Sequence, residues 1–419
     1  MALRPSLNSW NPLRAGGTEM PPNLLLLVKI IALALLLTNH ARLLPDPFLP
    51  FLPVLDALPG AAFQFTMKAV FLCAAFALLC NIAVRWSALA LGASILVSVV
   101  ASKAYYGNNK TFAGLMLLFA GLSDYDRPLY LLRWQLSLVY FGAGLNKIMD
   151  GDWQSGLFFE HWARMKVKNP VYVVVSDMLP PLVAGKFMCW FTAVAELGAS
   201  VGLLFARAAP YALWANVLFQ AGLLEFTGTT FTMFFYAMEA ATLAFVVWPK
   251  QILVIYDGDC GLCNRIRRTC ESVDFDGMFV WSAYQSGIGD QPGIGDQSGV
   301  GDQPADTGKK HGIAIPALEE KMHIVVDNTE VLSGFAAFRR MLMCSPWFWL
   351  LLTAVIAAPP ESWQTWRRII VALTVCLFLP IFRPIGELVY SWVARNRRRI
   401  MPSSTCGLEP ANRNTINKA

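Results

Sequence analysis

The chain has 419 residues, of which 56% are hydrophobic and only 15% are charged. This composition belongs to a membrane protein rather than to a water-soluble enzyme, and the apolar residues gather before residue 249 and after residue 346. The net charge of +6 comes mostly from a few arginine clusters, which favours acidic lipid headgroups and argues against nucleic acid as a partner.

Apolar blocks in the first 248 residues predict a polytopic α-helical membrane domain of about eight helices over residues 23–248, after an N-terminal segment of residues 1–22. Each block is expected to be helical because a bilayer core requires roughly 20 apolar residues whose backbone groups are satisfied internally. The blocks cover residues 24–38, 65–84, 89–101, 112–122, 131–147, 182–205, 211–226 and 231–248. Lys29 lies inside the first block, so its ammonium group is expected to face protein or water. We expect no cleavable signal peptide, because no small-residue cleavage pattern follows this block.

Two cysteines mark the start of a more polar segment over residues 250–345. Residues 251–256 form a strand-like run rich in Ile and Val, and Cys260 and Cys263 follow where helical spacing begins. The free amide groups and the positive dipole end of a helix start favour an anion, so the first sulfur can ionise near neutral pH. The spacing therefore indicates a redox dithiol. The other seven of the nine cysteines are irregularly placed, which argues against the disulfide framework of a secreted domain.

The remainder of the polar segment predicts an α/β thioredoxin-like domain over residues 250–345. Residues 279–284 and 323–327 read as strands, residues 327–330 as a turn into a partner strand, and residues 334–343 as a helix. A threefold glycine-rich hexad interrupts this order, with Asp290, Asp296 and Asp302 at equivalent positions. We predict that residues 287–310 are a disordered insertion, because three short glycine- and proline-rich repeats cannot build a core.

Two short apolar runs, residues 347–358 and 369–382, follow the soluble segment and predict membrane-associated helices within residues 346–400. Arg395, Arg397, Arg398 and Arg399 end this region and are expected at the membrane surface, ahead of a tail of residues 401–419. The late arginine clusters favour a cytoplasmic position for the dithiol domain, and the inner membrane of a bacterium is the expected location.

The nine residues from Tyr256 to Asn264, YDGDCGLCN, resemble the signature of the DCC family of thiol-disulfide oxidoreductases. Further matches follow in the order of that family, at Phe279–Val280, Gln285–Ser286, Gly334 with Ala337, and residues 390–397. The resemblance covers about residues 250–400 and implies a thioredoxin-like fold with protein-disulfide reductase activity. It implies that Cys260 is the attacking sulfur and Cys263 the resolving one, with a disulfide-bearing protein or a small thiol as substrate and no required cofactor.

Asp257 and Asp259 flank the dithiol and are expected to support the site. Two carboxylates would raise a thiol pKa and oppose the helix dipole, so the activation of Cys260 is not decided by the sequence. One carboxylate could relay a proton or cap the helix, and capping and turn formation are the favoured roles of Asp259. Pro316 lies several residues before the third strand, so no proline is expected to face the dithiol.

The run from Arg133 to Lys147, followed by Asp152, Trp153 and Gly156, resembles the HTTM domain, the membrane module shared with the vitamin K-dependent gamma-carboxylase. The resemblance covers roughly residues 20–248 and implies that Lys147 matches a proposed catalytic base. Carboxylase activity is not expected, because Lys110 stands where that family has a histidine and no large substrate-binding domain follows. We expect Lys147 to be a cation at a helix end, paired with Asp150 or Asp152, beside a residual role in quinone or isoprenoid-lipid handling.

Other interpretations of the dithiol segment remain open at this point. Asp257 and Asp259 after a strand are also typical of haloacid dehalogenase-type phosphatases, although Gly261 stands where a Thr or Val is usual. A zinc site would need ligands beyond Cys260 and Cys263, from Cys270, His311 or His323, without regular spacing, so no metal is expected. The broadest alternative is a membrane scaffold or lipid-binding protein with a redox-sensing dithiol. A lipid-soluble quinone that exchanges electrons with the dithiol is the cofactor hypothesis.

Overall fold

The computed structural model describes residues 10–44, 59–101, 105–123, 130–227, 232–284, 311–357 and 364–401. These residues form two compact units. The first contains residues 1–247 and 349–375, and the second contains residues 248–348 and 376–419. The predicted combination of an α-helical membrane domain and an α/β domain is confirmed. The glycine-rich hexads and the tail after residue 401 lie outside the described residues.

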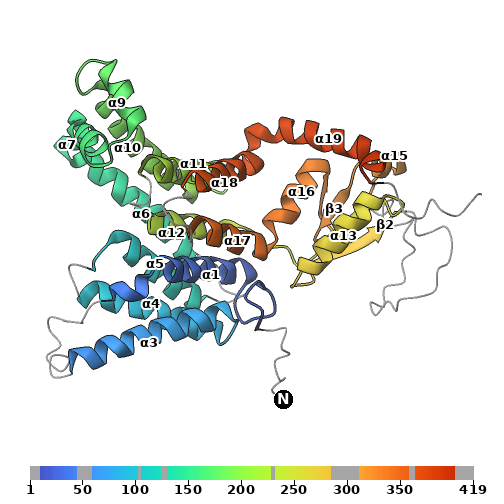
Figure 1. Ribbon diagram of the computed structural model, residues 1–419, viewed down its shortest axis with the longest axis horizontal. Helices are drawn as coiled ribbons and strands as arrows, with labels where there is room; N and C mark the ends of the chain where they lie inside the picture. Colours follow the sequence, from blue (N-terminus) through green and yellow to red (C-terminus); the bar gives the residue numbers. More distant parts are fainter. Residues whose placement is uncertain are drawn as a thin grey trace, which may run out of the picture. The chain divides into compact units, whose positions relative to one another are not determined.

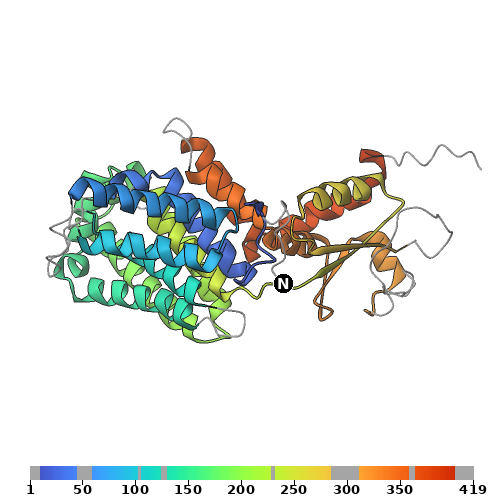
Figure 2. The same ribbon diagram turned by 90° about the horizontal axis from the view of Figure 1, so that it is seen from below.

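All eight apolar blocks predicted before residue 249 contain a helix, and these helices lie in the first unit (Figures 1 and 2). Parts of α17 (Pro346–Ala357) and α18 (Gln364–Phe378) belong to the same unit. They are α1 (Pro22–Leu37), α3 (Gly60–Leu79), α4 (Val84–Ala101), α5 (Asn108–Leu122), α6 (Tyr130–Met149), α10 (Val183–Leu204), α11 (Ala209–Thr227) and α12 (Thr232–Thr242). Shorter helices connect α6 to α10, namely α7 (Gly151–Ser155), α8 (Leu157–His161) and α9 (Pro170–Asp177).

Small residues let these helices approach closely. A Cβ atom on Gly92 of α4 would lie 2.8 Å from the backbone oxygen of Gly114 on α5, so a larger residue could enter only if the helices moved apart. Ser137 of α6 donates a hydrogen bond of 2.8 Å to the backbone oxygen of Ser200 on α10. Close backbone approach and polar contacts between helices are what stabilise bundles in a lipid environment.

Three of the described helices, α3, α4 and α10, are long and apolar enough to cross a membrane. Two further pairs, each interrupted by a bend, pass the same test when the pair is taken as one span. These pairs are Gly334–Met343 with Pro346–Ala357, and Thr365–Phe378 with Pro380–Arg397. Membrane crossing by all eight predicted helices therefore stays a prediction, because α1, α5, α6, α11 and α12 are not among the helices that pass the test.

Lys29 of α1 is fully buried, and its Nζ atom donates to the backbone oxygens of Pro12 and Arg14 at 2.7 and 2.6 Å. The expectation that this cation faces protein is confirmed. The partners of the Lys29 ammonium group are backbone carbonyls of the chain segment that precedes α1 and packs against this helix.

The second unit is built on a four-stranded sheet in the order β2-β1-β3-β4. Its strands are β1 (Ile252–Tyr256), β2 (Phe279–Ala283), β3 (His323–Val326) and β4 (Glu330–Ser333). β1 and β2 are parallel and are connected through α13 (Gly261–Val273), while β3 runs antiparallel to both β1 and β4. The β-α-β and β-β-α order expected from the sequence is therefore present.

The tight hairpin between β3 and β4 is explained by Asp327 and Asn328, which have φ angles of 47° and 57°. Two successive positive φ values are typical of the two-residue turns whose twist fits a hairpin, and Asp and Asn tolerate them. Asp327 Oδ1 also accepts hydrogen bonds from the backbone amides of Lys250 and Gln251, at 2.8 and 3.0 Å. The turn thus holds the chain at the entry to β1.

Alternate residues of the central strands face opposite sides of the sheet, as the pleat requires. One side buries Ile252 and Val254 of β1 against Met341 of α16 (Gly334–Met343), and the other buries Ile255 against Leu318 of α15 (Ile315–Glu320). The long C-terminal helix α19 (Arg383–Ile400) contacts both α13 and α16 (Figure 1). A sheet with both faces covered fixes the end of β1, where the cysteines lie.

Candidate functional site

The dithiol lies in the short turn that joins β1 to α13. The backbone amide of Cys260 donates to the carbonyl of Asp257 at 3.2 Å, which closes the turn. Cys260 is the residue immediately before the first turn of α13, and its Sγ atom accepts a hydrogen bond from the backbone amide of Cys263 at 3.4 Å. Cys260 is 1% exposed and Cys263 is half-buried. The two predicted cysteines are thus brought together at a helix N-terminus.

Asp259 lies in the turn before α13, as predicted, but it does not cap the helix, so the capping part of the prediction was wrong. The capping position belongs to the Cys260 sulfur, one residue later. Asp257 shapes the turn instead, because its Oδ1 atom accepts the backbone amide of Asp259 at 3.1 Å. The Asn264 side chain closes the other side of the turn by donating to the backbone oxygen of Gly258 at 2.6 Å.

Arg397 of α19 is a member of the site that sequence reasoning missed. Its Nη2 atom lies 2.8 Å from Oδ2 of Asp257, and the two side chains are 12% and 1% exposed. The same nitrogen donates to the backbone oxygen of Glu319 at 2.6 Å. Arg397 was expected on the membrane surface with its neighbouring arginines, and the structure corrects this for Arg397. The only indication of Arg397 in the sequence was its place in the run of residues 390–397 that resembles the DCC family. That run did not identify Asp257 as the partner of Arg397.

The pKa of the Cys260 thiol is lowered to about 6. The largest cause is the hydrogen bond from the Cys263 side chain, and the Cys263 backbone amide and the Arg397 cation act in the same direction. Burial and the Asp257 carboxylate oppose the shift. The expected effect of Asp257 on the thiol is therefore present but is outweighed. Cys260 is mostly a thiolate at neutral pH, which is the nucleophilic form of cysteine.

The pKa of Cys263 is shifted upward, because its thiol donates to the Cys260 sulfur and because it is partly buried. One sulfur is therefore ready to attack, and the other retains its proton until the first has reacted. Cys344 behaves differently from both, since burial raises the pKa of its thiol to about 11. Within the described residues, no group of three or more His, Cys, Asp or Glu side chains is arranged to hold a metal ion.

Comparison with known families agrees with this geometry. A family model described as DCC1-like thiol-disulfide oxidoreductase matches residues 254–366, and a model described as HTTM domain matches residues 126–248. The chain joins an HTTM domain to a DCC1-like thiol-disulfide oxidoreductase domain. No solved structure matches the chain. Arg397 lies beyond the last residue of the DCC1-like match, so this match assigns it no role.

Lys147, the candidate residue of the HTTM domain, lies in the last turn of α6. Its Nζ atom lies 2.6 Å from Oε2 of Glu196 on α10, and the side chains are 16% and 9% exposed. The ring of Trp153 lies 5.0 Å from the same nitrogen. The partner expected from the sequence was wrong, because Asp150 instead accepts the backbone amides of Asp152 and Trp153 at the start of α7. Lys147 is thus a partly buried, paired cation.

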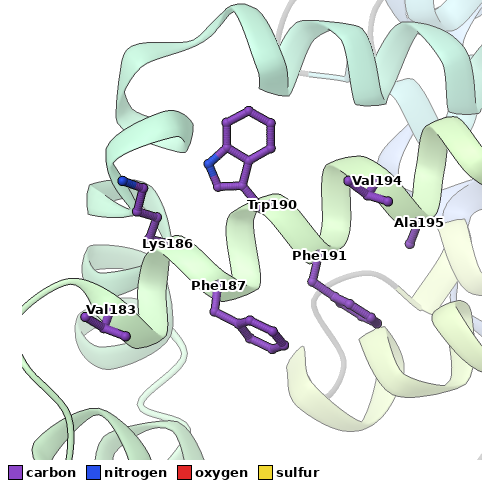
Figure 3. Close-up of a pocket in the computed structure, with 7 residues that line it drawn as sticks. All are labelled: Val183, Lys186, Phe187, Trp190, Phe191, Val194 and Ala195. Atoms are coloured by element: carbon purple, nitrogen blue, oxygen red, sulfur yellow. The ribbon is translucent and has the colours of Figure 1, made fainter.

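A shallow apolar groove of about 540 Å³ follows α10 of the HTTM domain. Figure 3 shows Phe187 and Phe191 on one side of the helix and Trp190 on the other, with Lys186 near the helix start. The two phenyl rings are stacked with centroids 6.1 Å apart. A groove with this lining suits hydrocarbon chains, as expected for a helix that crosses a bilayer.

Proposed function

We propose that this integral membrane protein is a protein-disulfide reductase in which Cys260 attacks the substrate and Cys263 resolves the intermediate. The observation that carries the proposal is the hydrogen bond of 3.4 Å from the Cys263 amide to the Cys260 sulfur at the start of α13. This arrangement stabilises a thiolate on the first sulfur and keeps the second within reach. The DCC1-like match supports the reaction class.

In the first step the Cys260 thiolate attacks one sulfur of the substrate disulfide. A bond forms between Cys260 and that sulfur, the substrate disulfide breaks, and the released substrate thiolate takes up a proton. Cys263 then loses its proton and attacks Cys260, so the Cys260–Cys263 disulfide forms and the second substrate thiol leaves. Two electrons and two protons pass to the substrate. A thiol donor or a lipid-soluble quinol must return two electrons and two protons to the protein.

A quinone couple is the donor that the pairing of domains suggests. The HTTM domain is embedded in the phase where quinones dissolve, and α10 exposes an apolar groove there. The test is anaerobic incubation of oxidised protein with a quinol, followed by thiol counting at Cys260 and Cys263. If no quinol reduces these cysteines while small thiols do so, the quinone coupling is wrong and a thiol is the donor.

The burial of Cys260 restricts the substrate. Because only 1% of Cys260 is exposed, the flat surface of a folded protein cannot bring a disulfide to its sulfur without a change in the turn. An extended peptide segment or a small disulfide is therefore the favoured substrate. The same burial also favours a second candidate, a membrane scaffold whose dithiol senses oxidants without turnover.

Cysteine variants separate the two candidates. We expect Cys260→Ser to abolish the reduction of insulin or of a small aromatic disulfide, because the attacking thiolate is removed. Cys263→Ser is expected to lose turnover as well, but to accumulate a mixed disulfide at Cys260 that mass spectrometry detects. Cys344→Ser is the matched control, since its buried thiol has a raised pKa and lies outside the turn. Absence of disulfide turnover in the unmodified protein, with a Cys260–Cys263 pair that still oxidises, would support the scaffold.

The C-terminal helix α19 supplies a further contact with the bilayer in this proposal. Ile385, Leu388, Val389 and Trp392 recur at helical spacing and are between 58% and 69% exposed. Such an apolar stripe beside a basic helix end is typical of helices that lie in a membrane interface. We place the DCC1-like domain on the cytoplasmic side of a bacterial inner membrane, where the basic cluster meets anionic lipids.

A further inference from the structure

We propose that Arg397 is a positioning residue of the dithiol, which neutralises the buried Asp257 carboxylate beside Cys260 and fixes the turn that presents the thiolate. The reactivity of Cys260 would then depend on α19, a helix whose Arg397 is 140 residues away from Asp257 in the sequence. This inference rests on the proposed thiol chemistry, but its test requires no disulfide substrate.

The contact geometry is the first argument. Arg397 forms an ion pair of 2.8 Å with Asp257, and the Asp257 side chain is 1% exposed. A buried carboxylate without a cation would be strongly unfavourable, and it would lie three residues from the sulfur that must become an anion. The second bond of Arg397, 2.6 Å to the backbone oxygen of Glu319, ties the pair to the end of α15.

The second argument is that the two carboxylate oxygens of Asp257 have different partners. One oxygen of Asp257 accepts the Asp259 amide and the other accepts Arg397. The carboxylate that sets the backbone of the turn is thus the group that Arg397 holds. A shift of this carboxylate would move the turn that ends at Cys260, because the Cys260 amide donates to the Asp257 carbonyl.

The third argument is electrostatic. The charged and titratable groups that act on Cys260 are Cys263 of α13, Arg397 of α19 and Asp257 of the turn. Arg397 lowers the pKa of Cys260 and of Cys263, while Asp257 raises both. The effects of the two charges on the pKa of Cys260 are therefore opposite in direction. Because Arg397 opposes the effect of Asp257, the hydrogen bonds from the Cys263 thiol and amide lower the pKa of Cys260. The simple alternative is that Arg397 only holds α19 in place, where a cation also suits the C-terminal end of a helix.

A double-mutant cycle on the full chain in lipid nanodiscs distinguishes these roles. The measurement is the pH dependence of Cys260 alkylation by iodoacetamide in the reduced protein, followed on the Cys260 peptide by mass spectrometry. We expect Arg397→Gln to move the midpoint upward by about one pH unit, which is about a tenfold lower rate at low pH. The reason is that the Arg397 cation, which lowers the pKa of Cys260, is removed, while the Asp257 carboxylate, which raises it, remains.

The other two variants of the cycle are expected to differ from Arg397→Gln in the midpoint of alkylation. Asp257→Asn is expected to move the midpoint downward, because the opposing charge is removed and Arg397 remains. The double variant Asp257→Asn/Arg397→Gln is expected to return close to the unmodified profile, since both charges are absent. Arg395→Gln is the matched control, because this exposed arginine of the same helix is bonded only locally, to the backbone oxygen of Ser391 at 3.1 Å, in the contacts described for it. Its profile should not change.

Three results would overturn the inference: an unchanged midpoint in Arg397→Gln, a double variant as shifted as Arg397→Gln, or an equal shift in Arg395→Gln. If Arg397→Gln does not fold, Asp257→Asn and Arg397→Lys carry the test, and an unchanged midpoint in Asp257→Asn overturns the inference. If the alkylation profiles follow the cycle but no disulfide is reduced, the role of Arg397 stands and the reductase proposal fails.

Discussion

At the scale of single residues, the dithiol is asymmetric. Cys260 lies at the helix start with a pKa lowered to about 6, and Cys263, three residues later, has a pKa above its usual range. A shared proton explains both shifts, because the Cys263 thiol donates to the Cys260 sulfur and becomes harder to ionise in doing so. The order of reaction implied by the family resemblance therefore has a physical basis in this chain.

This asymmetry predicts a pH-dependent selectivity among the free thiols. Because the folded pKa of Cys260 is below that of an ordinary thiol, its thiolate is lost only as the pH falls through about 6. We expect iodoacetamide to label Cys260 first at neutral pH, with a rate that is flat above about pH 8. Cys344, with a pKa of about 11, should label only at alkaline pH. Peptide mapping of brief labelling reactions measures the order, and faster labelling of Cys344 at neutral pH would contradict it.

At the scale of elements, α19 has two different sides. Toward the domain, Arg397 reaches Asp257, and the Tyr390 hydroxyl accepts the backbone amide of Met322 at 3.2 Å. Away from these contacts, Leu388 and Trp392 are 69% and 60% exposed. A helix that both completes the site and exposes an apolar stripe would connect the dithiol to the bilayer surface.

This arrangement predicts lipid contact along one side of α19. In nanodiscs that contain a photoactivatable phospholipid, we expect crosslinks on Leu388 and Trp392 after irradiation, since their exposed apolar side chains would enter the acyl region. Val280 and Val331, exposed apolar residues on the strands of the same domain, are the matched controls and should remain unlabelled. Labelling confined to the HTTM domain would show that α19 does not lie in the interface.

At the scale of the whole molecule, an HTTM domain and a DCC1-like domain share one membrane protein. The side of the membrane on which Cys260 works decides its electron donor, because cytoplasmic thiols are kept reduced and external ones meet oxidising conditions. The arginine clusters of α13 and α19 favour the cytoplasm.

The sidedness gives a prediction for intact cells. A membrane-impermeant maleimide should leave the Cys260 peptide unlabelled in whole cells and label it after permeabilisation, because we propose that the domain faces the cytoplasm. A membrane-permeant maleimide applied to whole cells is the control for reactivity. Labelling of Cys260 by the impermeant reagent in intact cells would place the domain outside and exclude cytoplasmic donors.

The local elements could be derived from the sequence because their causes are local. The apolar blocks form helices, because a helix satisfies the backbone hydrogen bonds of its own segment in lipid. The order of strand, Cys-X-X-Cys turn and helix places Cys260 at a helix start. The Asp327 and Asn328 turn followed from the few residue types that tolerate positive φ angles.

Partners brought from distant positions required the tertiary structure. Glu196 pairs with Lys147 because α6 and α10 pack together, and Arg397 pairs with Asp257 because α19 contacts α13. Composition and spacing show where a charge stands, but a buried charge takes the nearest opposite charge in space, and packing decides which one that is. The sequence therefore identifies the two sulfurs, and the fold identifies the arginine that accompanies them.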